Sequence, residues 1–228
     1  MSNERETLSR LVRPTKRYDY LDSGAEIYVD SFATIRREAS FEDIPREAEK
    51  LAVRVIHGSG QVDLVSDLVV HPRLVSSARA SLSSGAPILT DARMVAMGIT
   101  SARLPAANEV LCFLNDERVP VLSAKWGTTR TAAAVSLWEP HLDGAVVVIG
   151  NAPTALFHLM EMLIDGAPRP AAVIGCPVGF IGAAESKDAL LSLAHDHEID
   201  IPFVTVRGRR GGSAVASSAV NALSQEEE

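Results

Sequence analysis

The clearest pattern in the chain is an alternation of short apolar runs with segments whose apolar residues recur every three or four positions. Residues 145–149 form an apolar run rich in valine, and residues 171–174 form a second one. Between them, leucine, methionine and isoleucine recur at helical spacing over 153–164, and Gly166 follows. This strand–helix–strand pattern is typical of a right-handed crossover between parallel strands. Because both runs are apolar throughout, we expect helices to cover both faces of their sheet.

The same alternation continues on either side of this centre. Further strands are predicted at 87–90, 109–114 and 202–206. Helices are predicted at 25–38, 43–56, 73–82, 92–97, 128–141, 186–195 and 212–223. About five strands separated by helices indicate the α/β class. We expect a three-layer α/β/α fold with a mostly parallel sheet and additional N-terminal helices.

The chain shows no internal repeat and no linker of low complexity. We therefore expect residues 18–228 to form one domain. The polar segment 1–17 precedes it and is interpreted as a mobile N-terminal extension.

Composition and charge narrow the class of protein. The formal net charge of the 228 residues is −7, which argues against a general nucleic-acid or membrane-surface binder. No apolar run approaches the roughly 18 residues of a membrane-spanning helix, and the polar N-terminus does not resemble a signal peptide. A cytoplasmic location is expected. Cys112 and Cys176 lie in or beside predicted strands, so we interpret them as small buried side chains rather than a disulfide or metal pair.

His57 is the most informative single candidate for chemistry. It lies on the last turn of a predicted helix, directly before Gly58-Ser-Gly60. A helix C-terminus carries partial negative charge, which favours imidazolium and would keep the pKa of His57 near neutral. The residue could therefore act as a general acid or base. Taken alone, the residues favour the simpler interpretation that His57 caps the helix.

Several predicted loops combine glycine with hydroxyl, amide or cationic side chains where helices begin. Such loops can bind carboxylates or phosphates. Their candidate ligand-binding residues are Thr129, Arg130, Asn151, Thr154, Ser186, Lys187, Arg207 and Ser213. A surface arginine beside an ordinary helix cap explains Arg130 equally well, and a lone lysine such as Lys187 is usually solvated.

Several known motifs are missing from the sequence. It contains no Gly-Lys-Ser/Thr phosphate loop, no Gly-x-Gly-x-x-Gly fingerprint and no Gly-x-Ser-x-Gly elbow. The histidines do not combine with cysteine or carboxylate at metal-ligand spacing, so no metal site is predicted. The residues alone suggest an enzyme for a substrate with several negative groups.

Longer segments point to a family. They include VIHGSG at 55–60, GTTRTAAAVSLW at 127–138, GNAPTAL at 150–156 and PVGFIGAAESK at 177–187. On these segments, the chain from about residue 18 to 223 resembles the precorrin-8X methylmutase family of cobalamin biosynthesis. The long, unusual runs make the resemblance specific.

The resemblance implies an isomerase that moves a methyl group from C11 to C12 of a corrinoid ring. The substrate would be precorrin-8X or cobalt-precorrin-8, and the product hydrogenobyrinate or cobyrinate. It implies no external cofactor and a homodimer that holds each ring near the subunit interface. By the family's motifs, His57 is the catalytic proton donor and acceptor, and Ser31 and Arg130 contact substrate. The loop residues named above suit the acetate and propionate side chains of the ring. The alternative is a non-catalytic corrinoid carrier of the same fold.

Overall fold

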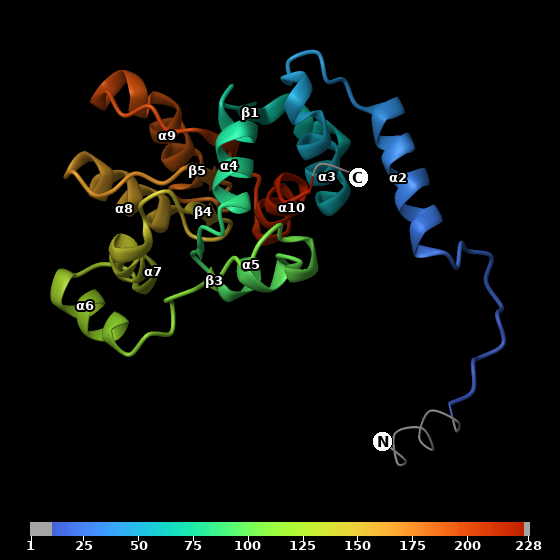
Figure 1. Ribbon diagram of the computed structural model, residues 1–228, viewed down its shortest axis with the longest axis horizontal. Helices are drawn as coiled ribbons and strands as arrows, with labels where there is room; N and C mark the ends of the chain where they lie inside the picture. Colours follow the sequence, from blue (N-terminus) through green and yellow to red (C-terminus); the bar gives the residue numbers. More distant parts are fainter. Residues whose placement is uncertain (1–10, 226–228) are drawn as a thin grey trace.

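The valine-rich runs form the middle of a six-stranded sheet in the computed structural model, which describes residues 11–225 (Figure 1). The strand order is β1-β6-β5-β4-β2-β3. Neighbouring strands are parallel except for β1, which pairs antiparallel with β6 at one edge. The strands are β1 (Leu68–Val70), β2 (Ile88–Thr90), β3 (Val110–Leu111), β4 (Val146–Ile149), β5 (Ala172–Gly175) and β6 (Phe203–Val206).

Alternating residues of the central strands enter two separate cores. Val146 and Val148 belong to the core beneath α3, α4, α5 and α10, whereas Val147 and Ile149 belong to the core beneath α8 and α9. All four side chains are fully buried, which explains the continuous apolar run in the sequence. The helices are α3 (Glu49–Ser59), α4 (Leu74–Ser83), α5 (Arg93–Gly98), α8 (Pro153–Ile164), α9 (Ala183–His197) and α10 (Ser213–Leu223).

The predicted α/β class and layer order are confirmed, but two elements were not predicted. The sheet has a sixth strand, β1, which is only three residues long and lies at an edge, so its sequence signal is weak. Helix α6 (Arg118–Trp126) has Val119 as its one buried residue among those described, so it lacks an apolar stripe. The helix expected at 128–141 is divided into α7 (Arg130–Val135) and a 3-10 segment, Ser136–His141, that contains Pro140.

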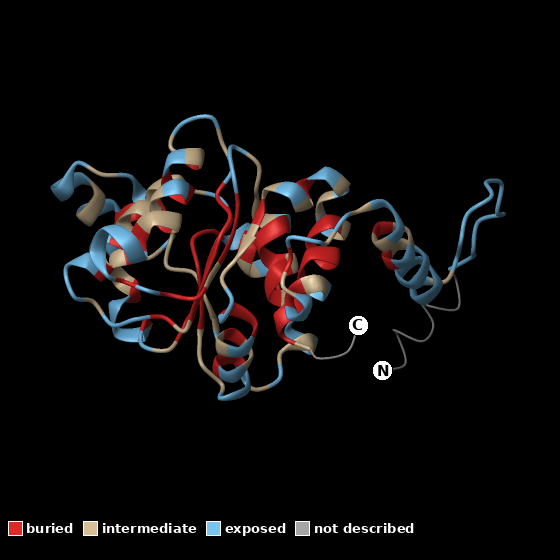
Figure 2. Ribbon diagram, turned by 90° about the horizontal axis from the view of Figure 1, so that it is seen from above, coloured by how far each residue is buried: buried red, intermediate tan, exposed pale blue. Residues whose placement is uncertain are grey.

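The N-terminal part lies beside the body of the molecule. Helix α2 (Gly24–Glu38) stands apart from the sheet and packs on α3, with most of its surface exposed (Figures 1 and 2). Phe32 and Ile35 provide its buried side, against Val53 and Ile56 of α3. Residues 11–23 form no regular element and are almost entirely exposed. Residues 1–10 of the expected extension lie outside the described residues.

Two further findings concern the described range. Neither cysteine forms a disulfide, and Cys176 is buried as predicted, whereas Cys112 is half-buried. None of the helices formed by residues 11–225 combines the length and the apolar character needed to cross a membrane.

Candidate active site

His57 lies at the end of α3, where the chain approaches α10 closely. Gly60 ends the helix with a φ of 68°, a left-handed conformation that glycine adopts without strain. One residue after His57, Gly58 packs directly on α10, because a Cβ at this position would collide with the hydroxyl of Ser218. The close helix contact therefore fixes the backbone that carries the histidine. Because α3 and α10 pack together and contribute to the same core, His57 lies on the α10 side of the sheet.

Helix α2 supplies three side chains that surround the histidine ring. The hydroxyl of Ser31 lies 2.8 Å from Nδ1 of His57. The rings of Tyr28 and Phe32 lie 5.1 Å and 5.2 Å from the imidazole, centroid to centroid, and the Phe32 ring is edge-on. Residues 28, 31 and 32 share one face of α2 because they are three and four positions apart. The structure thus brings together Ser31 and His57, two of the three residues that the family resemblance implies.

The protonation of His57 differs from the sequence-based expectation. Burial lowers the pKa of His57 from its ordinary value, and the positive charge of Arg54 lowers it further. These two effects oppose the helix-end effect that was expected to favour imidazolium. A serine hydroxyl can donate to a neutral Nδ1 and accept from a protonated one. Ser31 can therefore keep the ring oriented while His57 gains and loses a proton.

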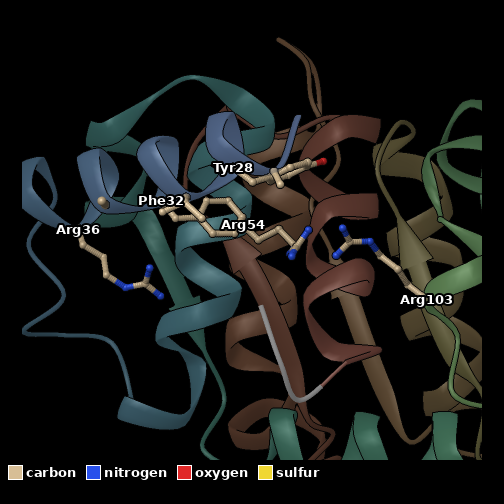
Figure 3. Close-up of a pocket in the computed structure, with 8 residues that line it drawn as sticks. Tyr28, Phe32, Arg36, Arg54 and Arg103 are labelled. Atoms are coloured by element: carbon tan, nitrogen blue, oxygen red, sulfur yellow. The ribbon is translucent and has the colours of Figure 1, made fainter. Parts of the chain in front are cut away.

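A cavity of about 550 Å³ opens beside this cluster, between α2, α3 and the segment 101–103 (Figure 3). We call it the arginine pocket. Its lining residues are Ala25, Tyr28, Val29, Phe32, Ala33, Arg36, Arg54 and Arg103. Tyr28 and Phe32 line it and also contact the imidazole of His57, and none of its described lining residues is acidic. The chemistry of this lining suits an anion that also carries apolar groups.

Arg130 and Thr129 lie on the other side of the sheet from His57. Thr129 caps α7 by accepting from the backbone N–H of Ala132, and its hydroxyl lies 2.9 Å from that of Thr154. Arg130 is exposed and donates to the carbonyl of Leu114 at 3.2 Å. Figure 1 shows α7 far from α2 and α3. Within one chain, Arg130 and His57 do not belong to the same site.

The loop at Asn151 corrects an expectation. Its backbone amides were predicted to face an external anion, but Asp91 already occupies them. The carboxylate of Asp91 accepts from the N–H groups of Gly150, Asn151 and Ala152 at 2.8–3.0 Å. Asp91 is 2 % exposed. The side chains of Asn151 and Thr154 remain at least partly exposed, but the three amides do not face a ligand.

Ser186 and Lys187 also differ from expectation, because α9 begins at Ala183 and turns both side chains inward. Each has 0 % exposed surface. Ser186 donates to the carbonyl of Ala183, and the ammonium of Lys187 donates to the carbonyl of Arg210 at 2.7 Å. Lys187 is therefore not a solvated lysine, and neither residue reaches a ligand in this conformation. Burial lowers the pKa of Lys187.

The basic glycine loop after β6 is anchored rather than free. Arg207 is exposed, and Ser213 is half-buried at the first position of α10. Arg210 donates to carboxylates of Asp63 and Asp67. Together with the bond from Lys187, these contacts tie the loop to the body of the protein. Arg207 and Ser213 are still open to a ligand, as is Arg209, which is exposed and lies over the Phe180 ring.

The sequence did not indicate the arginine pocket or the role of Asp91. Arg36, Arg54 and Arg103 come from three different segments, so no local motif connects them. Asp91 gave a faint signal, because it directly follows the predicted strand at 87–90 and thus lies at the carboxyl edge of the sheet. Residues 11–225 contain no group of three histidine, cysteine or acidic residues that could hold a metal ion.

The fold and this site define a class: an α/β protein in which a serine hydroxyl contacts a histidine ring beside an arginine-lined cavity. Comparison with known sequences adds the family. The sequence profile of the precorrin-8X methylmutase family matches residues 26–226. The chain belongs to this family and is an isomerase of cobalamin biosynthesis.

Individual relatives agree with this assignment. The precorrin-8X methylmutase of Pseudomonas aeruginosa is 57% identical over 210 residues, which cover 92% of this chain and 99% of the relative. The cobalt-precorrin-8 methylmutase of Methanothermobacter thermautotrophicus is 37% identical, covering 83% of this chain and 87% of the relative. The crystal structure of the Thermus thermophilus precorrin-8X methylmutase superposes with a TM-score of 0.78 at 35% identity, covering 88% of this chain and 95% of that one.

Proposed function

We propose that this isomerase moves the methyl group of precorrin-8X from C11 to C12 of the ring to give hydrogenobyrinate, and that His57 is the catalytic residue. The observation that carries the proposal is the contact of 2.8 Å between Ser31 and Nδ1 of His57. It engages Nδ1 and leaves Nε2, the nitrogen not bonded to serine, as the nitrogen proposed to exchange a proton with the substrate. Proton transfer from a positioned histidine is a common route to activate a conjugated system.

In the proposed reaction, His57 donates one proton to the substrate ring and later accepts one back. His57 transfers a proton to the conjugated ring, the bond from the methyl group to C11 breaks, and its bond to C12 forms. Loss of a proton from the rearranged ring returns His57 to its starting state, so substrate and product are isomers. Burial and the charge of Arg54 lower the pKa of His57 and so favour the neutral ring in the free enzyme. A bound polycarboxylate would raise the pKa of His57, because negative charge nearby favours imidazolium.

The relatives favour the metal-free substrate. Two relatives named precorrin-8X methylmutase, from Pseudomonas aeruginosa and a Sinorhizobium species, are 57% and 56% identical to this chain. Relatives named cobalt-precorrin-8 methylmutase, such as those from Leptospira interrogans and Salmonella typhimurium, are 32% and 37% identical. We therefore propose precorrin-8X over cobalt-precorrin-8. Comparing kcat/KM for the two substrates tests this choice.

We also propose that the protein is a homodimer with each ring bound near the subunit interface. The supporting observation is the separation of Arg130 from His57 within one chain, since a second subunit could bring an Arg130 to each His57. Mixing two impaired variants, His57→Ala and Arg130→Ala, tests the arrangement. If sites are shared, random reassembly restores roughly a quarter of wild-type activity. No restoration after verified subunit exchange would contradict it.

We place the reaction in the cytoplasm. Both cysteines are free thiols, as is usual in a reducing compartment. Fractionation of cells that express the protein at native level would test this location.

The decisive experiment follows the absorption spectrum of precorrin-8X with wild-type protein and with His57→Ala. We expect the product spectrum with the wild type, and a rate about 10²- to 10⁴-fold lower with the variant. Pigment binding, measured separately, should survive in the variant. Bound but unchanged pigment with both proteins would instead identify a carrier.

A further inference from the structure

The loops that follow β5 and β6 are tied to each other through their backbones. The N–H of Gly179 donates to the carbonyl of Arg209 at 3.2 Å, and the N–H of Gly212 donates to the carbonyl of Cys176 at 2.9 Å. Because β5 and β6 are parallel neighbours, both loops lie at the carboxyl edge of the sheet. We call these segments the paired loops, residues 176–182 and 207–212.

The paired loops hold two large apolar side chains away from the core. Phe180 is 84% exposed, and Ile181 is 89% exposed. The guanidinium of Arg209 lies 5.2 Å from the centroid of the Phe180 ring. Single exposed apolar residues are common, but an adjacent pair on an anchored loop beside a cavity is typical of a surface that contacts a ligand or another protein.

Such a cavity, of about 370 Å³, lies between the paired loops and the end of α3. Phe180 and Arg209 line one side, and Gln61, Leu64 and Val215 line the other. Leu64 and Val215 belong to the core beneath α3 and α10, so the cavity lies on the same side of the sheet as the catalytic histidine. Its volume is near the lower end of the range for small-molecule sites, so it can hold part of a larger ligand.

The charge on this surface comes from Arg209. Its side chain is exposed and stacks on Phe180, and its guanidinium forms no ion pair within residues 11–225. Arg210, in contrast, donates to carboxylates of Asp63 and Asp67. None of the described residues that line the cavity is acidic. A cation stacked on an aromatic ring beside an apolar cavity suits a ligand that has an apolar body and a carboxylate at its edge.

The cavity lies close to His57 along the chain and in space. Gln61 follows His57 by four residues, so their Cα atoms lie within about 14 Å of each other. Gly58, next to His57, packs on the first turns of α10, which also provide Val215. A ring of corrinoid size bound at His57 would therefore reach the paired loops with one of its edges.

We propose that Phe180 and Arg209 form a second contact for the substrate ring. Phe180 packs on an apolar edge of the ring, and Arg209 pairs with one of its acetate or propionate arms. The two side chains determine affinity and the choice of ring, whereas His57 transfers the proton. This inference rests on the proposed function, because the ring is the same one.

The first test compares Phe180→Ala with Ile164→Ala as the matched control. Ile164 is an exposed apolar residue at the end of α8, at the opposite edge of the sheet. In Phe180→Ala we expect the KM for precorrin-8X and the Kd for hydrogenobyrinate to rise about tenfold, because an apolar contact is lost. The contact exists before and during the reaction, so kcat should change little. Phe180→Leu should recover part of the affinity, and the control should behave as wild type.

The second test changes the charge. Arg209→Gln should raise the Kd for hydrogenobyrinate about tenfold but leave nearly unchanged the Kd for the same ring with its carboxyl groups converted to amides. Phe180→Ala should weaken both ligands equally, because it removes no charge. Arg209→Lys should recover part of the affinity for the acid. Arg169→Gln, at an exposed position before β5, is the matched control.

Three results would overturn the proposal. An unchanged Kd for hydrogenobyrinate in either variant would remove the contact that the variant tests. Equal weakening of acid and amide in Arg209→Gln would show that Arg209 does not pair with a carboxylate. An altered dimer equilibrium in Phe180→Ala, with unchanged ligand affinity, would show that a second copy of the chain covers this surface instead.

The outcomes also separate this inference from the proposed function. Wild-type turnover with no effect of Phe180→Ala or Arg209→Gln would leave the isomerase intact and remove only the second contact. Absence of wild-type turnover, with weaker hydrogenobyrinate binding in both variants, would support the second contact and refute the reaction.

Discussion

Ser31 and His57 meet across two helices, with 2.8 Å between the serine hydroxyl and Nδ1 of the imidazole. Ser31 belongs to α2, which has few other contacts with the body of the protein, and His57 belongs to α3, which packs closely on α10. The pair therefore joins a largely exposed helix to a well-packed one. The orientation of the His57 imidazole therefore depends on where α2 lies.

Replacing Ser31 with alanine should slow the reaction without preventing binding. The variant loses the hydrogen bond that orients the imidazole, and we expect kcat to fall about 10- to 100-fold. KM should change little. Initial rates and a product-binding titration measure the two effects. A Ser31→Thr variant keeps the hydroxyl and should retain more activity; equal loss in both variants would show that the hydroxyl is not the important group.

The titration of His57 should occur below its ordinary pKa of about 6.5. Burial is the larger cause and the charge of Arg54 the smaller one. Because the folded state binds the proton less readily than the unfolded state, the free energy of unfolding should decrease as the pH falls through 6.5 and below. NMR titration of the ring, assigned with His57→Gln, measures the midpoint. In His57→Gln, the free energy of unfolding should depend less on pH in this range. A titration midpoint above 6.5 would refute the lowered pKa of His57.

Replacing Asp91 with asparagine should destabilise the fold by about 2–4 kcal/mol. The carboxylate accepts three backbone N–H groups, whereas an asparagine side chain would turn a donor toward at least one of them. Urea unfolding measures the loss. Asp143→Asn is a suitable control, because Asp143 is exposed and should tolerate the change. Similar midpoints for the two variants would mean that the buried carboxylate contributes little.

Replacing Gly58 with alanine should separate α3 from α10. The new methyl group would collide with the hydroxyl of Ser218, and we expect a cost of about 1–3 kcal/mol together with reduced kcat, because His57 is the preceding residue. The second change Ser218→Ala removes the nearest atom of the clash and should restore part of the loss. If the double variant is as impaired as the single one, another contact determines this approach.

Replacing Lys187 with methionine should remove part of the pH dependence of the free energy of unfolding at alkaline pH. The pKa of this buried lysine is lowered, so the unfolded state binds more protons, and stability of the wild type should rise with pH toward the ordinary lysine pKa of about 10.4. The difference in unfolding free energy between wild type and Lys187→Met therefore grows from pH 7 to pH 9.5. Lys125→Met, at an exposed position, provides the control. A difference in unfolding free energy that does not change with pH would show that the pKa of Lys187 is not lowered.

The sheet could be predicted from the sequence because its signals are local. Val146 to Ile149 form an unbroken apolar run, and that run is apolar because the two faces of β4 enter two different cores. Strand β1 could not be predicted in the same way. It gains its place by antiparallel pairing with β6, more than a hundred residues later, and that pairing leaves no mark in three residues.

Only part of the site could be predicted, because tertiary contacts, like the pairing of β1, leave no local signal in the sequence. His57 has a local signal, because it lies between a helix and two glycines. Its surroundings come from tertiary contacts: Tyr28 reaches the imidazole only because α2 folds back onto α3, and Arg103 reaches the pocket from a segment between α5 and β3. The pKa of His57 is lowered mainly because the side chain is partly buried, and this burial could not be predicted from the sequence. The opposite expectation was wrong for that reason.

Asp91 gives the loop after β4 a ligand that is part of the same chain. A free phosphate or nucleotide would have to displace the Asp91 carboxylate from these three amides. Because Asp91 belongs to the same chain, its effective concentration at the amides is fixed. In many phosphate-binding proteins, amides at this edge of the sheet bind the phosphate. Here, the Asp91 side chain already occupies the three amides after β4. Inorganic phosphate should therefore not bind at these three amides, and groups elsewhere in the protein must recognise the substrate.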